Sequence, residues 1–241
     1  GNCLLSKRPD RYLPKNWPTY FASCKGVEVV DLDGNKFIDM AQMAVGSAIL
    51  GYSNYDLVNA VNKASKNGVN CTLNSPEEVY LAEKLLKLNP FAGGVKFAKT
   101  GAEAMSIAIR IARAYTNKDK VAFSGYHGWS DWYMATNLAR SDNLNNHLLP
   151  GLSTQGVPKG LKDTVIPFIY NSVEDFTKVM KENPDVGIIC IEGARFEYPS
   201  QDFMKAIMKI SKEKGIVIVS DEITSGWRVT DGGVYKINGF K

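Results

Sequence analysis

The sequence has few of the residues that build metal centres and disulfide frameworks. Its 241 residues include only two His, and its four Cys stand apart in the chain, at Cys3, Cys24, Cys71 and Cys190. None of them forms a Cys-x-x-Cys pair, and this spacing argues against a zinc site. Separated thiols, in a chain without a recognisable signal peptide, favour a reducing, cytoplasmic location.

Long apolar runs and a one-sided charge are missing as well. No stretch reaches the roughly 20 apolar residues that a helix needs to span a bilayer, so we expect no membrane segment. The net charge is only +4 and the basic residues are scattered, which argues against a nucleic-acid partner. The hydrophobic content of 44% is enough for a sizeable buried core.

Strand and helix patterns alternate along most of the chain. The pattern predicts strands at 95–99, 164–171, 186–193 and 215–222, and a strand that runs into a turn at 120–129. The segments between them carry helical spacing, most clearly at 100–116 and 202–214. This order predicts an α/β fold with a mostly parallel sheet covered by helices on both faces. Residues 137–163 are rich in Asn, Ser and Gly, and we expect a long surface loop there.

The N-terminal part has a different pattern. Residues 1–50 read as an extended segment followed by a β-hairpin that turns at Asp33-Gly34-Asn35. Helices are expected at 54–67 and from Pro76 onward, with Ser75 as the cap of the second. We therefore divide the chain into an N-terminal segment, 1–50, and a large domain, 51–241.

The predicted strands of the large domain end in distinctive polar groups. In an open parallel sheet, ligands bind at the carboxyl ends of the strands. Four such ends carry Thr100 to Glu103, Gly125 to Gly128, Glu192, and the adjacent acids Asp221 and Glu222. Their convergence on one edge of the sheet predicts a single binding site.

Taken alone, each of these groups has a structural explanation. A helix beginning after Thr100 could bind a phosphate at its N-terminus, but Thr100 could also be an ordinary cap. Tyr126, between glycines, could stack on a planar ring or cover a sheet edge. A Ser-His-Asp triad around His127 is disfavoured, because no Gly-x-Ser-x-Gly turn is present.

Asp221 also has both a chemical and a structural explanation. A carboxylate at the end of a buried strand loses its hydration and needs a partner. The partner could be a protonated ring nitrogen of a cofactor. It could equally be Arg228 or a nearby Lys in a salt bridge.

Six motifs, taken together, favour the chemical explanation. The stretch "VIVSDEITSGWR" resembles the strand-Asp-Glu-Val-x-x-Gly-Phe-Arg signature of the class III aminotransferases, which use pyridoxal 5′-phosphate. Five further stretches resemble motifs of the same family in the same order, namely "VVDLDGNKFIDM", "AILGYSNYDLVNAV", "KFAKTGAEAMSIAIRIAR", "GYHGWSDW" and "IICIEGARFE". The most similar branch contains glutamate-1-semialdehyde aminomutase and its relatives. The resemblance implies the large domain of a fold type I pyridoxal-phosphate enzyme.

The resemblance also implies roles for individual residues. Gly101 and Ala102 would donate backbone N–H groups to the cofactor phosphate, and Tyr126 would stack on the pyridine ring. Asp221 would pair with the pyridinium nitrogen, and Ile223 would pack on the other ring face. A protonated ring nitrogen makes the cofactor an electron sink.

Three further residues would lie near a small amino substrate. Glu197 has the spacing of a polar residue beside the substrate or the cofactor hydroxyl, and Met43 and Trp129 would line the pocket. The resemblance further implies a homodimer with its active site at the subunit interface.

The sequence departs from the family at several positions. Thr100-Gly101-Ala102 replaces Ser-Gly-Thr, and Gly193 replaces the Pro that usually follows Glu192. The Schiff-base lysine has no counterpart, because Lys236 and Lys241 lack its flanking pattern. We therefore expect the chain to be the large-domain part of a longer enzyme and inactive alone. A non-catalytic binding or dimerisation protein, and a different α/β enzyme that binds a sugar phosphate, remain open alternatives.

Overall fold

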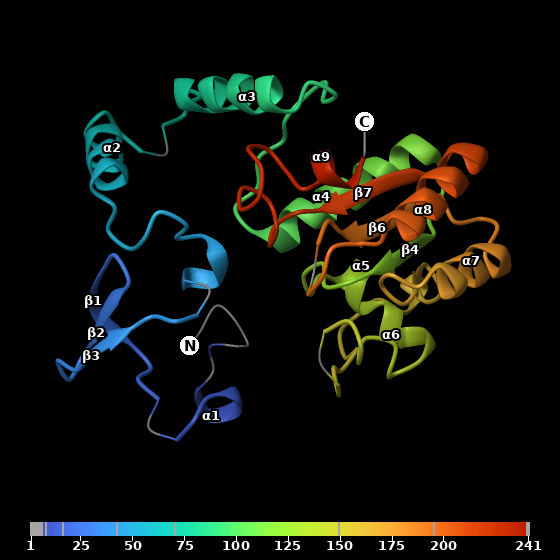
Figure 1. The fold of residues 1–241 in the computed structure, drawn as a ribbon, viewed down its shortest axis with the longest axis horizontal. Helices are drawn as coiled ribbons and strands as arrows, with labels where there is room; N and C mark the ends of the chain where they lie inside the picture. Colours follow the sequence, from blue (N-terminus) through green and yellow to red (C-terminus); the bar gives the residue numbers. More distant parts are fainter. Residues whose placement is uncertain are drawn as a thin grey trace. The chain divides into compact units, whose positions relative to one another are not determined.

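The chain forms two compact units, Gly1–Ser75 and Pro76–Lys241 (Figure 1). The computed structural model describes residues 7, 9–15, 17–41, 43–69, 71–148, 150–194 and 196–239. Cys3 and Lys241, which the sequence analysis named, lie outside these residues. The division into an N-terminal segment, 1–50, and a large domain, 51–241, stays a prediction.

The first unit is built around a three-stranded antiparallel sheet in the order β1-β2-β3. Its elements are α1 (Pro9–Tyr12), β1 (Phe21–Lys25), β2 (Glu28–Asp31), β3 (Lys36–Ile38), η2 (Met43–Gly46) and α2 (Tyr55–Lys66). The predicted hairpin is confirmed between β2 and β3. The Asp31 carboxylate closes its turn by accepting the backbone N–H groups of Asp33, at 2.9 Å, and Asn35, at 2.8 Å.

The second unit contains a four-stranded sheet in the order β5-β4-β6-β7, and all of its pairs are parallel. Its strands are β4 (Val121–Ser124), β5 (Val165–Pro167), β6 (Ile188–Glu192) and β7 (Val217–Asp221). The chain visits the inner strand β4 first and adds neighbours on both sides. This confirms the predicted α/β fold with a parallel sheet.

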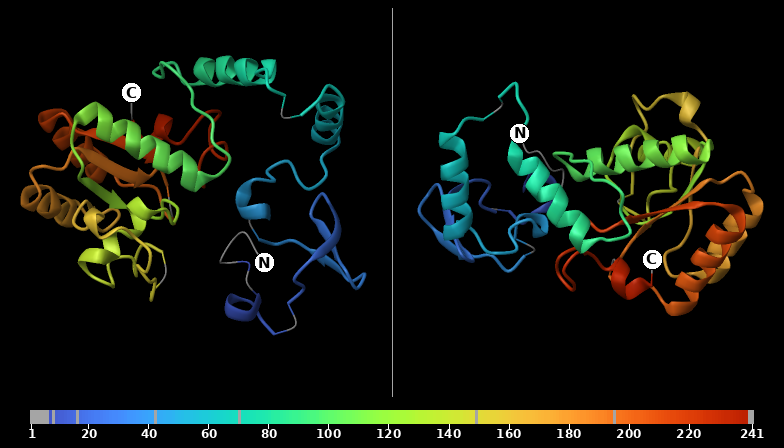
Figure 2. Two further views of the ribbon diagram at one scale, coloured as in Figure 1. Left: turned by 180° about the vertical axis from the view of Figure 1, so that it is seen from behind. Right: turned by 90° about the horizontal axis from the view of Figure 1, so that it is seen from above.

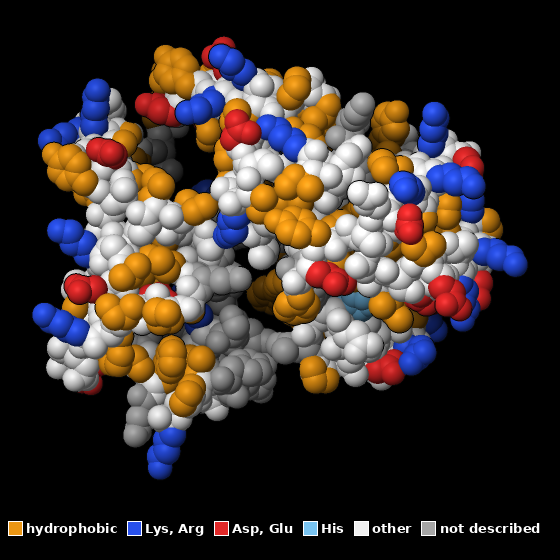
Figure 3. Space-filling view, in the orientation of Figure 1, with side chains coloured by type: hydrophobic (Ala, Val, Ile, Leu, Met, Phe, Trp, Pro, Cys, Tyr) orange, Lys and Arg blue, Asp and Glu red, His pale blue; other side chains and the backbone are white. Residues whose placement is uncertain are grey.

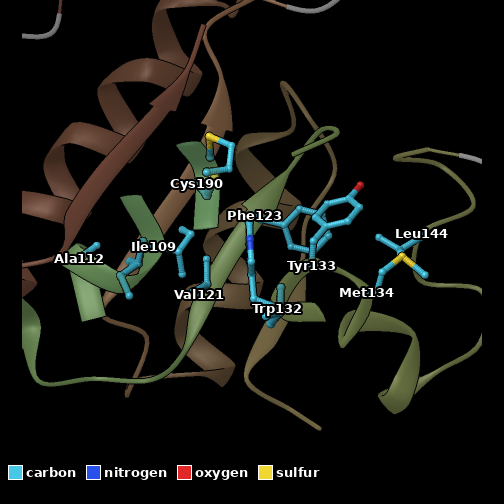
Figure 4. Packing of buried hydrophobic residues seen from close by; sticks show 12 residues of the cluster. Ile109, Ala112, Val121, Phe123, Trp132, Tyr133, Met134, Leu144 and Cys190 are labelled. Atoms are coloured by element: carbon cyan, nitrogen blue, oxygen red, sulfur yellow. The ribbon is translucent and has the colours of Figure 1, made fainter. Parts of the chain in front are cut away.

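Helices cover both faces of this sheet (Figure 2). The helices of this unit are α3 (Pro76–Leu88), α4 (Gly101–Thr116), α5 (Asp131–Met134), α6 (Thr136–Ala139), η3 (Lys159–Leu161), α7 (Val173–Glu182), α8 (Gln201–Lys214) and α9 (Tyr235–Asn238). One core layer joins α4 and α5 to the sheet through Ile109, Phe123 and Tyr133 (Figure 4). The other joins α7 and α8 to the opposite face through Phe176 and Phe203.

Two helices keep their apolar faces at the surface. Neither α2 nor α3 has a buried residue, although each carries apolar side chains at helical spacing. Tyr55 of α2 is 77% exposed and Tyr80 of α3 is 65% exposed, and apolar side chains are visible across the surface (Figure 3). The described residues therefore leave these faces uncovered. No helix in the described ranges has both the length and the apolar character of a membrane span.

One local prediction is wrong and another is incomplete. Residues 95–99 run without strand pairing to any described segment, and the apolar side chains Val95 and Phe97 are partly exposed. A strand needs a hydrogen-bonded neighbour, which sequence pattern alone cannot supply. The expected surface loop at 137–163 is confirmed over most of its described length, but it is anchored in the core at Leu144, which is fully buried and whose N–H donates to the Asn137 side chain at 3.0 Å.

The central strand gives a direct test of this core. Ile189 of β6 is fully buried beside Ala122 and Ile218 of the adjoining strands. Ile189→Ala should lower the free energy of unfolding by about 3 kcal/mol, through lost apolar burial and the cavity left behind. Urea denaturation measures this cost. The matched change Ile111→Ala, at a side chain that is 58% exposed, should cost less than about 0.5 kcal/mol. Equal costs would contradict the packing described.

Candidate functional site

The carboxyl ends of the parallel strands gather the predicted site groups at one edge of the sheet. In the β6–β7 register Glu192 lies opposite Asp221, and in the β4–β6 register Ser124 lies opposite Ile191. The N-terminus of α4 meets the same edge. A Cβ atom added at Gly101 would lie 2.9 Å from Cδ1 of Ile223, so the two residues are in close contact.

A capping box starts α4 at this edge. The Thr100 hydroxyl accepts the Glu103 N–H at 3.2 Å, and the Glu103 carboxylate accepts the N–H of Thr100 at 3.0 Å. The structural reading of Thr100 as a helix cap is thereby confirmed. The box fixes the backbone direction of the first turn.

The next two amides of α4 are not used by this box. Among the described residues, neither the Gly101 N–H nor the Ala102 N–H has an acceptor. Both belong to the first turn of a 16-residue helix, where the partial positive charge of the helix dipole is concentrated. Two free donors at this place suit an anion such as a phosphate.

A tight turn after β4 packs against this helix end. Gly125 and Gly128 adopt φ values of +114° and +83°, which residues with a side chain rarely adopt. A Cβ atom at Gly128 would lie 2.8 Å from Cβ of Ala102, and one at Gly125 would collide with the Glu192 carboxylate. Glycine is thus required at both positions for the turn to approach its neighbours so closely.

Tyr126 lies within this turn and is 37% exposed. Its N–H donates to Oε2 of Glu192 at 3.2 Å, which fixes the backbone of the turn to β6. Partial burial raises the pKa of the Tyr126 phenol, and the negative charge of Asp221 raises it further. The ring is therefore neutral and lies within electrostatic reach of Asp221.

Asp221 is buried and held by two hydrogen bonds. Its Oδ2 lies 2.8 Å from Nδ1 of His127, and its Oδ1 accepts the Ile223 N–H at 3.0 Å. The ionic partner of Asp221 in the structure is thus His127, which the sequence analysis had not paired with it. The only sequence signal was a His in a glycine-flanked turn beside a buried strand.

His127 is fully buried beneath the turn. Its second ring nitrogen, Nε2, lies 3.2 Å from the backbone oxygen of Ser124. Burial opposes protonation, but the hydrogen-bonded Asp221 carboxylate outweighs burial and raises the pKa of His127 well above its usual value. Both ring nitrogens are engaged, so His127 has none left to activate a serine hydroxyl, as a hydrolase triad would require.

Glu222, the second acid of the pair, has a different task. Its carboxylate accepts the N–H groups of Val234, at 2.6 Å, and Tyr235, at 2.7 Å. These bonds attach the start of α9 to the end of β7. Glu222 thereby supports the fold beside the site, while Asp221 belongs to the site itself.

Five of the eight residues proposed for the site lie at this edge of the sheet, namely Gly101, Ala102, Tyr126, Asp221 and Ile223. Trp129 directly follows the turn and is 67% exposed. Glu197 accepts a hydrogen bond from the Asn171 side chain at 2.9 Å. Met43 belongs to the first unit, and its place in the pocket stays a prediction.

Comparisons with known proteins agree on one family. The family model described as aminotransferase class-III matches residues 14–236. A 3-aminobutyryl-CoA aminotransferase of Cloacimonas acidaminovorans is 32% identical over 99% of this chain and 55% of its own length. A glutamate-1-semialdehyde 2,1-aminomutase of Campylobacter hominis is 34% identical over 90% of this chain and 48% of its own length.

Solved structures show the same similarity. A transaminase with bound PLP superposes with a TM-score of 0.82 at 27% identity, over 95% of this chain and 54% of its own. An omega-transaminase from Sphaerobacter thermophilus, at 24% identity and a TM-score of 0.80, shares the fold over 94% of this chain and 53% of its own. The chain spans about half the length of the relatives it matches.

The buried pair of His127 and Asp221 should make stability depend on pH. The pKa of His127 is raised by folding, so its charge stabilises the fold fully below about pH 6.5, and the contribution is lost as the pH rises toward about 10. The free energy of unfolding lost in His127→Phe should therefore be largest at low pH and shrink across this range. Urea denaturation at a series of pH values measures it. Trp132 is a neighbour that does not titrate, so the free energy of unfolding lost in Trp132→Phe should not vary with pH. The same pH dependence in both variants would contradict a charged His127.

Proposed function

The chain belongs to the class III aminotransferases, and on this basis we propose that it forms the cofactor-binding large domain of a pyridoxal 5′-phosphate-dependent aminotransferase or aminomutase. The observation that carries the proposal is the position of the buried Asp221 carboxylate. It lies at the same sheet edge as Tyr126 and the free amides at the start of α4. A flat, anionic, nitrogen-containing ring fits this combination of groups.

The start of α4 would bind the phosphate. Gly101 and Ala102 offer two N–H donors without acceptors among the described residues, and the helix dipole adds a favourable field. Ala102 has no hydroxyl, so the backbone would supply these contacts. The packing of Gly128 on Ala102 supports this geometry by keeping the helix start and the turn together.

Tyr126 and Ile223 would enclose the ring. Tyr126 is partly exposed within electrostatic reach of Asp221, and the Ile223 N–H donates a hydrogen bond to Oδ1 of Asp221. An aromatic side chain and a β-branched aliphatic one present apolar surfaces that suit the two faces of a planar ring. They would also exclude water from it.

Asp221 would hold a proton on the ring nitrogen. When bound, pyridoxal phosphate supplies an electron sink for the negative charge formed at the substrate carbon, and the sink is effective while its ring nitrogen is protonated. A carboxylate that is already buried and fixed by two hydrogen bonds needs little rearrangement to stabilise that charge.

The lysine that binds the cofactor covalently would come from another part of a longer protein. Lys236 is engaged with Asp231, through the backbone oxygen at 2.6 Å and the carboxylate at 3.1 Å. Relatives about twice as long support this arrangement. We further propose a cytoplasmic homodimer that acts on a small amino compound, with a 3-amino acid derivative or an amino aldehyde as first candidates, since relatives named for such substrates match the chain.

Loss of the Asp221 carboxylate should slow the reaction without unfolding the protein. In the full-length protein, Asp221→Ala should lower the rate of amino-group exchange on the order of 10²-fold, because the charge stabilisation at the ring nitrogen is lost. Steady-state kinetics with a panel of amines measures the effect. Asp142→Asn, at a carboxylate paired with Arg140 on the surface, is the matched control and should react normally. Near-normal turnover in Asp221→Ala would make Asp221 a purely structural ion-pair residue.

The lysine that attaches the cofactor covalently should lie outside residues 1–241. The full-length protein is loaded with pyridoxal phosphate, reduced with borohydride, digested and analysed by mass spectrometry. We expect one stoichiometric lysine adduct beyond residues 1–241, because Lys236 is held by Asp231. An adduct on a lysine within 1–241 would refute this part of the proposal. Binding without any adduct or amino-group exchange would favour a non-catalytic protein.

A further inference from the structure

Both ring nitrogens of His127 face hydrogen-bond acceptors. Nδ1 lies 2.8 Å from the Asp221 carboxylate, and Nε2 lies 3.2 Å from the carbonyl oxygen of Ser124. A backbone carbonyl can only accept, so Nε2 must carry hydrogen. A neutral imidazole has a single N–H, and it would then leave a bare Nδ1 facing the carboxylate.

Only two arrangements place a proton in the contact with Asp221 and another in the contact with Ser124. Either His127 is doubly protonated beside a carboxylate, or Asp221 is protonated and donates to Nδ1. An ordinary imidazole holds a proton more tightly than an ordinary carboxylate, by about 2.6 pKa units. The Ile223 N–H at Oδ1 adds a further bond that favours the charged carboxylate. The first arrangement is therefore the stable one.

The neighbours of His127 leave Asp221 as its counter-ion. Phe123, Trp132 and Tyr133 surround the ring, and the Tyr133 hydroxyl donates to the Gly125 oxygen at 2.9 Å. Burial raises the pKa of the Cys190 thiol, which is thus neutral. Glu192 is directed to the turn, where it accepts the N–H of Tyr126.

We infer that His127 is a lasting imidazolium, and that it is a positioning residue that keeps Asp221 a fixed carboxylate facing the cofactor. The part concerning the cofactor rests on the proposed function. With His127 on Oδ2 and Ile223 on Oδ1, the carboxylate cannot rotate without losing a bond. The carboxylate held in this way would face the ring nitrogen of a bound cofactor as a hydrogen-bond acceptor.

The chain contains an internal comparison. His147, the second histidine, is also buried, but its Nδ1 accepts the Gly125 N–H at 3.3 Å. A nitrogen that accepts a hydrogen bond carries no proton. Two buried histidines that contact the same turn should thus differ in the protonation of Nδ1.

The test is nitrogen NMR of the full-length protein, labelled with ¹⁵N-histidine and free of cofactor. At about pH 8, where an unperturbed histidine is neutral, both nitrogens of His127 should show directly bonded hydrogen. His147 should show a hydrogen-free Nδ1. Because no cofactor is present, this result does not depend on the proposed function. A hydrogen-free nitrogen in His127 would overturn the inference.

Two variants assign the signals and test the cause. Asp221→Asn removes the counter-ion, so His127 should lose one ring proton at about pH 8, while Asp142→Asn should change neither histidine. His147→Gln removes the comparison signal and completes the assignment if either Asp variant is unstable. An unchanged, doubly protonated His127 in Asp221→Asn would show that Asp221 does not hold its charge, and would overturn the positioning role.

Discussion

The buried carboxylate of Asp221 is the constraint on which the architecture of the site depends. A charge at the end of a core strand loses its hydration, and a single broken contact would leave it uncompensated at a cost of several kcal/mol. The structure offsets this loss with the ring of His127 and the N–H of Ile223. Each partner is in turn fixed by its own neighbours, and the groups around the carboxylate behave as one unit.

The turn after β4 shows how this requirement shapes the backbone. His127 can lie under the sheet edge only because the chain reverses sharply at Gly125 and Gly128, both in the left-handed region. The same reversal brings Tyr126 to the surface and places Gly128 against Ala102 at the start of α4. The proposed phosphate donors, the residue proposed to stack on the ring and the carboxylate are therefore positioned by one short segment packed against one helix.

The sequence predicted the features that depend on local chemistry. Alternating Val/Ile runs and helix caps identified β4 to β7 and α2, α4, α7 and α8, and the ends of the strands identified Tyr126 and Asp221. It failed where the outcome depends on a distant partner. The strand at 95–99 has no described neighbour, and Leu144 is drawn into the core by contacts across the fold. The same reason explains why the His127 partner of Asp221, 94 residues away, and the backbone contacts of Glu222 were missed.

The central claim is that Asp221, oriented by His127, faces the ring nitrogen of pyridoxal phosphate. A crystal structure of the full-length protein with the cofactor bound tests it most directly. The account predicts the ring nitrogen about 2.7–3.0 Å from an Asp221 oxygen, with Nδ1 of His127 still bonded to Oδ2 and the phosphate at the Gly101 and Ala102 amides. A ring nitrogen beyond about 3.5 Å from Asp221, or a carboxylate turned away from His127, would contradict it.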